Sequence, residues 1–113
     1  MGAKLAVVNS DAKQNAITNQ LNGENHWFGL YRDPEDTSNW LWVDGTQFCS
    51  GYWNEGEPND VGGKEDCAEI RALKLWNDAA CTMYRRYVCE LNGRFISLLC
   101  IVNKVASNTE LLV

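Results

Sequence analysis

The stretches GEPNDVGGKEDC (residues 56–67) and LWND (residues 75–78) decide how this sequence can fold and act. They contain five side chains with carboxylate or carboxamide oxygens, namely Glu57, Asn59, Glu65, Asn77 and Asp78. Hard oxygen ligands suit Ca²⁺, whereas a transition-metal site would contain His or paired Cys. Their spacing is too irregular for an EF-hand, which takes its ligands from one loop of about twelve residues. A folded scaffold therefore has to bring the two stretches together.

Pro58 lies between two of these residues, Glu57 and Asn59. An X–Pro bond adopts the cis form at modest cost, and a cis bond would turn both neighbouring side chains toward one point. The alternative is an acidic surface loop with an ordinary trans proline. Residues 46–66 are rich in Gly, Asn and Glu, so we expect irregular structure there. A long irregular run in a compact domain is usually functional, and we interpret this one as a metal-binding loop.

Length and composition limit the classes of function. The chain has 113 residues, the size of one domain, and a formal net charge of −5 without a Lys/Arg cluster. We therefore expect no nucleic-acid partner and no membrane insertion. The five cysteines form no CxxC pair, which argues against a zinc ribbon, and five cysteines in so short a chain favour an oxidising compartment. No signal peptide is visible, so we interpret the chain as part of a secreted or cell-surface protein with an extracellular location.

Hydrophobic periodicity predicts one helix and several short strands. The expected strands cover residues 5–8, 26–30, 40–43, 67–71 and 86–90. The expected helix covers residues 11–21, with Ser10 as its N-cap and an apolar stripe of Ala12, Ala16, Ile17 and Leu21. Residues 31–39 are polar and contain a proline, so we expect a loop. His26 is expected to be a packed side chain rather than a catalyst, and Trp40 and Trp42 are expected to face the core.

Taken together, these motifs resemble the C-type lectin domain, in the subgroup whose EPN loop accepts mannose-type sugars. The resemblance covers residues 2–91, with further matches in LAVVNS at Leu5, WFGL at Trp27, WLWVDG at Trp40, EDCAEI at Glu65 and YVCE at Tyr87. It implies an α+β C-type lectin-like fold with short antiparallel sheets, one complete helix and a long calcium-binding loop region. The domain is expected at residues 1–92, without the family's first strand and the start of its first helix. Residues 93–113 do not resemble the family.

The resemblance also implies roles for the oxygen-bearing residues. Glu57, Asn59, Glu65 and Asn77 are expected to bind both Ca²⁺ and two neighbouring sugar hydroxyls, while Asp78 completes the metal shell. A hydroxyl is donor and acceptor at once, so residues bound to the metal can also recognise the sugar. Val61 is expected to touch the apolar face of the sugar, and the alternative is a plain loop residue.

A second family calcium site is matched less well. Its positions correspond to Asp36, Asp60, Glu65 and Asp66. Arg32 stands where an acid is usual, and a fixed positive charge there would repel Ca²⁺. Asp33 is the neighbour that would have to compensate for it.

The resemblance implies a disulfide between Cys67 and Cys81, which encloses the WND ligands. It leaves Cys89 without its usual mate, because the family partner lies in the missing first helix. Asn92 and Gly93 lie between two β-rich runs, which is a strong hairpin signal. A two-residue loop would pair residue 91 with 94 and residue 89 with 96. The tail would then cover the edge that the missing first strand normally covers; the alternative is an aberrant gene-model or splice end.

Three classes of function follow from these observations. The first is calcium-dependent binding of mannose-type sugars (mannose, N-acetylglucosamine, fucose) on glycans or glycoproteins. The second is a lectin-like module that binds a protein or another non-sugar ligand; retention of all five ligands favours the first. An enzyme is not expected, because no nucleophile–base pair, zinc triad or phosphate loop occurs. Glu57 and Glu65 could imitate a glycosidase pair, but a metal between them would occupy both.

Overall fold

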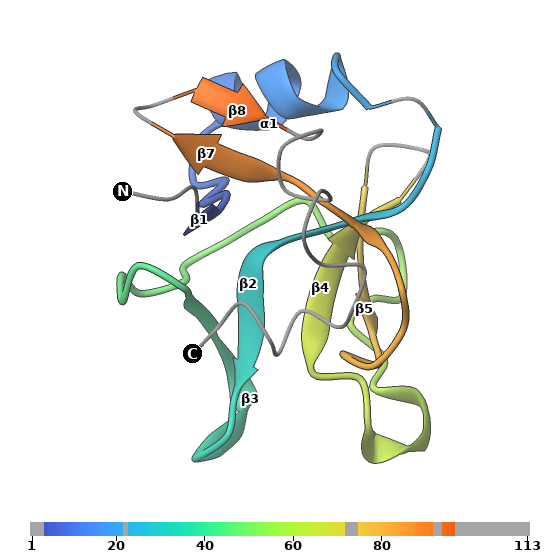
Figure 1. The fold of residues 1–113 in the computed structure, drawn as a ribbon. Coiled ribbons are helices and arrows are strands. Elements are labelled where there is room, and N and C mark those ends of the chain that lie inside the picture. Colours follow the sequence, from blue (N-terminus) through green and yellow to red (C-terminus); the bar gives the residue numbers. More distant parts are fainter. Residues whose placement is uncertain (1–3, 22, 72–74, 92–93, 97–113) are drawn as a thin grey trace.

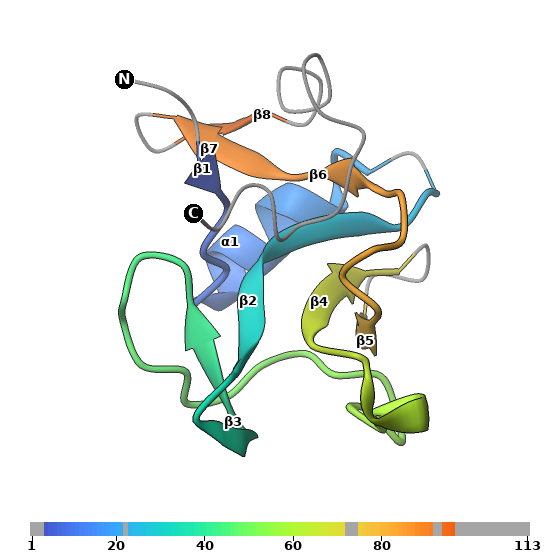
Figure 2. The same ribbon diagram turned by 60° about the horizontal axis from the view of Figure 1, so that its bottom comes forward.

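A computed structural model describes residues 4–21, 23–71, 75–91 and 94–96, the last three by their backbone only. The architecture is α+β (Figures 1 and 2). The elements are β1 (Lys4–Leu5), α1 (Asp11–Thr18), β2 (His26–Asp33), β3 (Asp36–Trp42), the 3-10 helix η1 (Val61–Gly63), β4 (Cys67–Ile70), β5 (Trp76–Ala79), β6 (Arg86–Tyr87), β7 (Cys89–Leu91) and β8 (Arg94–Ile96). One sheet has the order β1-β7-β8, and the other has the order β3-β2-β4-β5 with β6 paired to β2. The α+β fold class is confirmed.

Helix α1 begins as its sequence predicts. The Ser10 hydroxyl accepts a hydrogen bond from the Lys13 amide at 3.2 Å, so one free N–H of the first turn is capped. The helix ends at Thr18, and its buried face consists of Gln14, Ile17 and Thr18. The expected apolar stripe is therefore confirmed at Ile17 and Leu21, which pack in or against the core, and wrong at Ala12 and Ala16, which are exposed. Gln14 faces inward because its side-chain oxygen accepts a hydrogen bond from the buried Trp76 indole at 3.0 Å.

Strands β2 and β3 form a longer hairpin than periodicity predicts, so the loop expected at residues 31–39 is wrong. The antiparallel pairing continues from Leu30↔Trp42 through Arg32↔Trp40 to Asp33↔Asp36. The hairpin extends beyond the core, where polar side chains can stay exposed on a paired backbone. Only Pro34 and its neighbour remain for the turn, which agrees with the exclusion of proline from paired strands. Figures 1 and 2 show this hairpin tip and η1 at the same end of the molecule.

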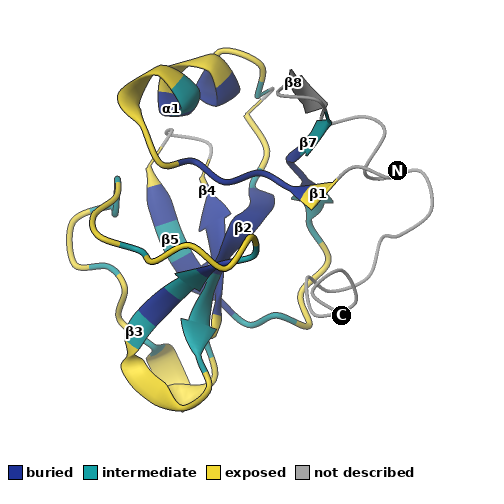
Figure 3. Ribbon diagram, turned by 90° about the vertical axis from the view of Figure 1, so that its left-hand side faces the viewer, coloured by how far each residue is buried: buried dark blue, intermediate teal, exposed yellow. Residues whose placement is uncertain are grey.

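The core is built from aromatic side chains around Trp76, the residue that precedes the two WND ligands. Trp76 is fully buried, and its ring lies 4.7 Å from Phe28 and 5.7 Å from Trp53, measured between centroids. Trp40 and Trp42 are buried, as expected. His26 is packed inside the fold at 1% exposure, with Nδ1 2.9 Å from the Glu24 carbonyl oxygen. The burial map shows β2, β4 and β5 as the buried centre of the fold (Figure 3).

The predicted strand at residues 86–90 divides between the two sheets. Val88 donates its amide to the Trp27 carbonyl and accepts from the Ala6 amide, at 2.8 and 2.9 Å. The chain passes at this residue from β6 in the large sheet to β7 in the small one. Strand β7 then pairs with β8 in the predicted hairpin register, Cys89↔Ile96 and Leu91↔Arg94. The register prediction is confirmed, while the two loop residues and residues 97–113 lie outside the described part.

The cysteines agree with the predictions in part. Cys67 and Cys81 form the expected disulfide. Cys89 is itself disulfide-bonded, so it has a partner other than the family mate that the resemblance implies is missing. Cys49 is exposed and free, and the pairing of Cys100 lies outside the described residues. In the described part of the chain, no helix is both long enough and apolar enough to span a membrane.

Candidate functional site

The EPND loop is held by a tight internal turn. The Glu57–Pro58 peptide bond is cis, and Asp60 adopts a left-handed conformation with φ 47°. The Asp60 carboxylate accepts from the Glu65 amide at 3.0 Å, and the Glu65 carboxylate accepts from the Val61 amide at 3.1 Å. These reciprocal bonds bend the loop back on itself. Glu57 and Glu65 therefore lie near one another, although eight positions separate them in the sequence.

Asp78 joins the WND segment to this loop. It lies on β5 and is fully buried, yet both of its carboxylate oxygens are bound. Oδ1 accepts from the Asn59 amide at 3.1 Å, and Oδ2 accepts from the Asp60 amide at 2.7 Å. A buried carboxylate is stable only when donors surround it, and the loop backbone supplies two of them. The two stretches singled out in the sequence thus converge, as predicted.

Glu57 lies against the Asp78 carboxylate, and a hydrogen bond between the two side chains requires a proton on one of them. Within the described part of the chain, the Oε1 atom of Glu57 is buried and has no hydrogen-bond partner. Burial raises the pKa of Glu57 above its ordinary value, and the adjoining Asp78 carboxylate and the charge of Glu65 raise it further. Arg71 acts in the opposite direction. Two carboxylates that face each other need a shared proton or a cation, and hard oxygen donors of this kind fit Ca²⁺.

The remaining loop ligands lie at the surface of the site. Asn59 is exposed and Glu65 is half-buried, so both are open to a ligand from solvent. Val61 is 64% exposed beside them. Among the described residues, no three His, Cys, Asp or Glu side chains converge closely enough to hold a metal by themselves. A cation here would depend on carboxamide oxygens as well as on carboxylates.

Asn77 is positioned by a buried ion pair that the sequence analysis missed. Its Nδ2 donates to Glu69 Oε2 at 2.9 Å, and Glu69 Oε1 accepts from Arg85 Nε at 2.8 Å. Glu69 is only 2% exposed and lies opposite Asn77 in the β4–β5 register. This bond engages the amide nitrogen, so the carboxamide oxygen is the atom of Asn77 that could bind a cation. An acidic residue inside a buried strand was the available sequence signal.

The residues of the expected second metal site do not gather around an open space. Asp60 and Asp66 both face the Arg32 guanidinium, at 3.8 and 3.1 Å. Asp36 instead accepts from the amide and hydroxyl of Ser38, at 3.2 and 2.7 Å. Asp33 accepts from the Glu35 amide at 2.8 Å, so its carboxylate caps the hairpin turn.

Comparison with known proteins identifies the family. A family model described as "Lectin C-type domain" matches residues 1–91. The chain belongs to the C-type lectin domain family. This is a family of carbohydrate-binding domains, and its fold is the one described above.

Two curated relatives show how far this C-type lectin domain extends. It is 42% identical over 92 residues to the hepatic lectin of Gallus gallus, covering 80% of this chain and 44% of the relative. It is 40% identical over 102 residues to human C-type lectin domain family 6 member A, covering 85% of this chain and 48% of the relative. The chain therefore spans less than half the length of both relatives.

Solved structures agree with the fold of this C-type lectin domain. The carbohydrate-recognition domain of the mouse scavenger receptor C-type lectin superposes with a TM-score of 0.74 at 32% identity, covering 81% of this chain and 74% of that one. The cow CD23 domain, crystallised in the presence of a GlcNAc2Man3 oligosaccharide, gives a TM-score of 0.64 at 32% identity. The match covers 70% of this chain and 60% of that one.

Proposed function

We propose that this C-type lectin domain binds mannose-type sugars through a Ca²⁺ ion held by Glu57, Asn59, Glu65, Asn77 and Asp78. The observation that carries the proposal is the buried Glu57 Oε1 atom, which has no hydrogen-bond partner among the described residues and belongs to a side chain that lies against the Asp78 carboxylate. A bound cation would neutralise this pair and satisfy the oxygen. The natural partners would be glycans or glycoproteins with terminal mannose-type sugars, in an extracellular setting, and no catalytic role is proposed.

The metal would supply open coordination positions for two neighbouring sugar hydroxyls. The chain's own residues supply the rest of the recognition. Glu57 and Glu65 accept hydrogen bonds from the hydroxyls, and the exposed Asn59 carboxamide donates hydrogen bonds to them. Glu69 fixes the Asn77 amide by the 2.9 Å hydrogen bond, so that the Asn77 oxygen is free to bind the ion. The exposed Val61 side chain offers an apolar contact at the rim.

The order of acceptor and donor across the cis proline supports mannose-type rather than galactose-type preference. Glu57 presents only acceptors on one side of Pro58, and Asn59 presents a donor on the other. The cow CD23 structure, obtained with an oligosaccharide that contains mannose and N-acetylglucosamine, is consistent with this choice. If the acceptor and donor positions were exchanged, the loop would no longer match the hydroxyls of mannose-type sugars.

A second candidate function is binding of a protein or another non-sugar ligand. It is supported by two adjacent exposed apolar side chains, Met83 and Tyr84, at 45% and 72% exposure. Exposed apolar patches mark interaction sites when they are contiguous and large. This pair is small, so the sugar proposal accounts for more of the structure.

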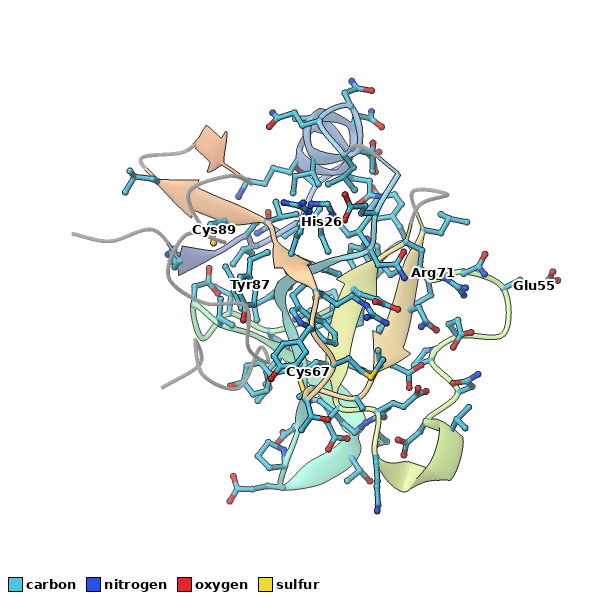
Figure 4. All side chains as sticks on the ribbon, turned by 45° about the vertical axis from the view of Figure 1, so that its right-hand side comes forward. His26, Glu55, Cys67, Arg71, Tyr87 and Cys89 are labelled. Carbon is cyan, nitrogen blue, oxygen red and sulfur yellow. A yellow bond between two sulfur atoms is a disulfide. The ribbon has the colours of Figure 1, made fainter. Side chains whose placement is uncertain are left out.

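The first test is a thermal melt of the chain in Ca²⁺ and in EDTA, followed by competition with mannose and galactose. A Ca²⁺ concentration of about 100 times the dissociation constant stabilises the folded chain by about 2.7 kcal/mol. The melting temperature should therefore rise by roughly 10 °C. The double variant Glu57→Gln, Asn59→Asp should retain the calcium shift but prefer galactose. Glu55→Gln is the matched control, because Glu55 is exposed and points away from the sheets (Figure 4). An absent calcium shift, or unchanged sugar preference in the double variant, would contradict the proposal.

A further inference from the structure

The guanidinium of Arg32 lies among three carboxylates at the end of the hairpin. Its Nε lies 3.1 Å from an oxygen of Asp66, and its Nη2 lies 3.0 Å from Asp78 and 3.8 Å from Asp60. The Arg32 side chain is only 9% exposed, and Asp78 is fully buried. These contacts join β2, the EPND loop and β5, which are far apart in the sequence.

Backbone carbonyl oxygens complete the shell around the same group. Arg32 Nη1 donates to the Thr37 carbonyl at 2.8 Å, and Nη2 donates to the Glu65 carbonyl at 2.9 Å. The ring of Trp40 lies against one face, 4.5 Å from the guanidinium carbon. Carboxylate and carbonyl oxygens are the ligand types that surround a hard metal ion in proteins. Here they surround a cation that is part of the chain.

We propose that Arg32 takes the place of an auxiliary metal ion and positions Asp78 for the proposed calcium site, so that the domain binds one Ca²⁺ rather than two. The second part of this inference rests on the proposed function, because it treats Asp78 as a ligand. Arg32 is thus a positioning residue that does not touch the sugar.

Shared contacts explain how this cation could act on the calcium site. Asp78 Oδ2 accepts from both Arg32 and the Asp60 amide, so one oxygen connects the guanidinium to the EPND loop. The planar guanidinium has five donors in a fixed geometry, which lets it hold several oxygens at once. A chelator removes a metal ion but cannot remove a side chain. The arrangement of Asp60, Asp66 and Asp78 should therefore persist in EDTA.

The test uses Arg32→Gln, which removes the charge but keeps an oxygen that a metal could use. Breaking a buried ion pair is strongly destabilising, so the melting temperature of the variant in EDTA should lie on the order of 10 °C below that of the wild type. Millimolar Ca²⁺ should recover most of this loss, because the freed carboxylates can bind a second ion. Isothermal titration should give one calcium per wild-type chain and two per variant chain. If Arg32 positions Asp78, the variant should bind its first calcium ion more weakly than the wild type. Simple electrostatics predicts the reverse, namely tighter binding at that site once the positive charge is removed.

Arg86→Gln is the matched control, because Arg86 makes an exposed ion pair with Glu24 at 3.0 Å. This control should melt within a few degrees of the wild type, as exposed ion pairs contribute little. Two calcium ions per wild-type chain would overturn the Arg32 inference while leaving the proposed function intact. No calcium in the wild type would overturn the proposed function, and the EDTA melts would then decide the Arg32 role. An Arg32→Gln melt equal to that of the wild type, or a loss that Ca²⁺ does not recover, would overturn the inference.

Discussion

Gly51→Ala should destabilise the domain, although Gly51 is exposed. A Cβ atom at this position would lie 2.7 and 2.8 Å from two ring atoms of Trp76 and closer still to a third. The ring cannot move away freely, because it is fully buried and packs against Phe28 and Trp53 at 4.7 and 5.7 Å between centroids. Backbone hydrogen bonds of 2.8 Å from Trp76 to Tyr52 and from Asn54 to Trp76 hold the loop against β5.

The size of the effect follows from this overlap. Adding a methyl group to a packed core costs about 1–3 kcal/mol, since neighbours must leave their preferred rotamers. For a domain of this size, that corresponds to a fall of about 5–15 °C in the melting temperature. Trp76 directly precedes Asn77 and Asp78, so the displaced ring should also weaken calcium binding. Thermal unfolding followed by circular dichroism, with a calcium titration, measures both effects.

Ser50→Ala is the control for this experiment, because Ser50 is the exposed neighbour in the same loop. Its melt should match that of the wild type within the small range typical of surface substitutions. If Gly51→Ala has the same melting temperature as Ser50→Ala, the loop does not pack tightly against Trp76 and the prediction is refuted. If it melts lower but binds calcium normally, the ring is not what positions the WND ligands.

Two further predictions concern stability. Burial lowers the pKa of His26 below its ordinary value of 6.5, and the Glu24 carbonyl and charge only partly oppose this. The unfolded chain then binds a proton that the folded chain does not, so in EDTA the free energy of unfolding should fall as pH drops below about 6.5. His26→Gln should flatten this part of the pH curve; an unchanged curve would refute the assignment. Cys81→Ser opens the disulfide to Cys67, 14 positions away, and should cost about 3 kcal/mol in chemical denaturation; a loss below about 1 kcal/mol would contradict it.

Local chemistry explains the sequence predictions that are confirmed. Ser10 caps α1 because a hydroxyl one turn before an amide can satisfy it without help from distant residues. The register of β7 and β8 follows from a two-residue connection, which leaves few ways to pair the flanking residues. Cys67 and Cys81 pair as the family resemblance implied.

The failed predictions have a different origin. The polar segment of residues 31–39 forms strands because backbone pairing with a neighbour stabilises it, not an apolar face. Gln14 is buried in the helix because a tryptophan 62 positions away donates to it. The partner of Gln14 is remote in the sequence, whereas the hairpin partner is local but polar, so hydrophobic periodicity reveals neither contact.

The sequence by itself determined the donor types of the candidate site, namely carboxylates and carboxamides on both sides of Pro58 and in the WND segment. It also determined that an arginine stands among the acids of the second site. Only the tertiary structure decided which oxygens face one another: Glu57 faces Asp78, and Asp78 binds Arg32. The physical reason is that side-chain direction depends on the register of β4 and β5 and on the bend of the EPND loop. The types of donor atom follow from the residues themselves, whereas the distances between these atoms depend on how remote segments pack together.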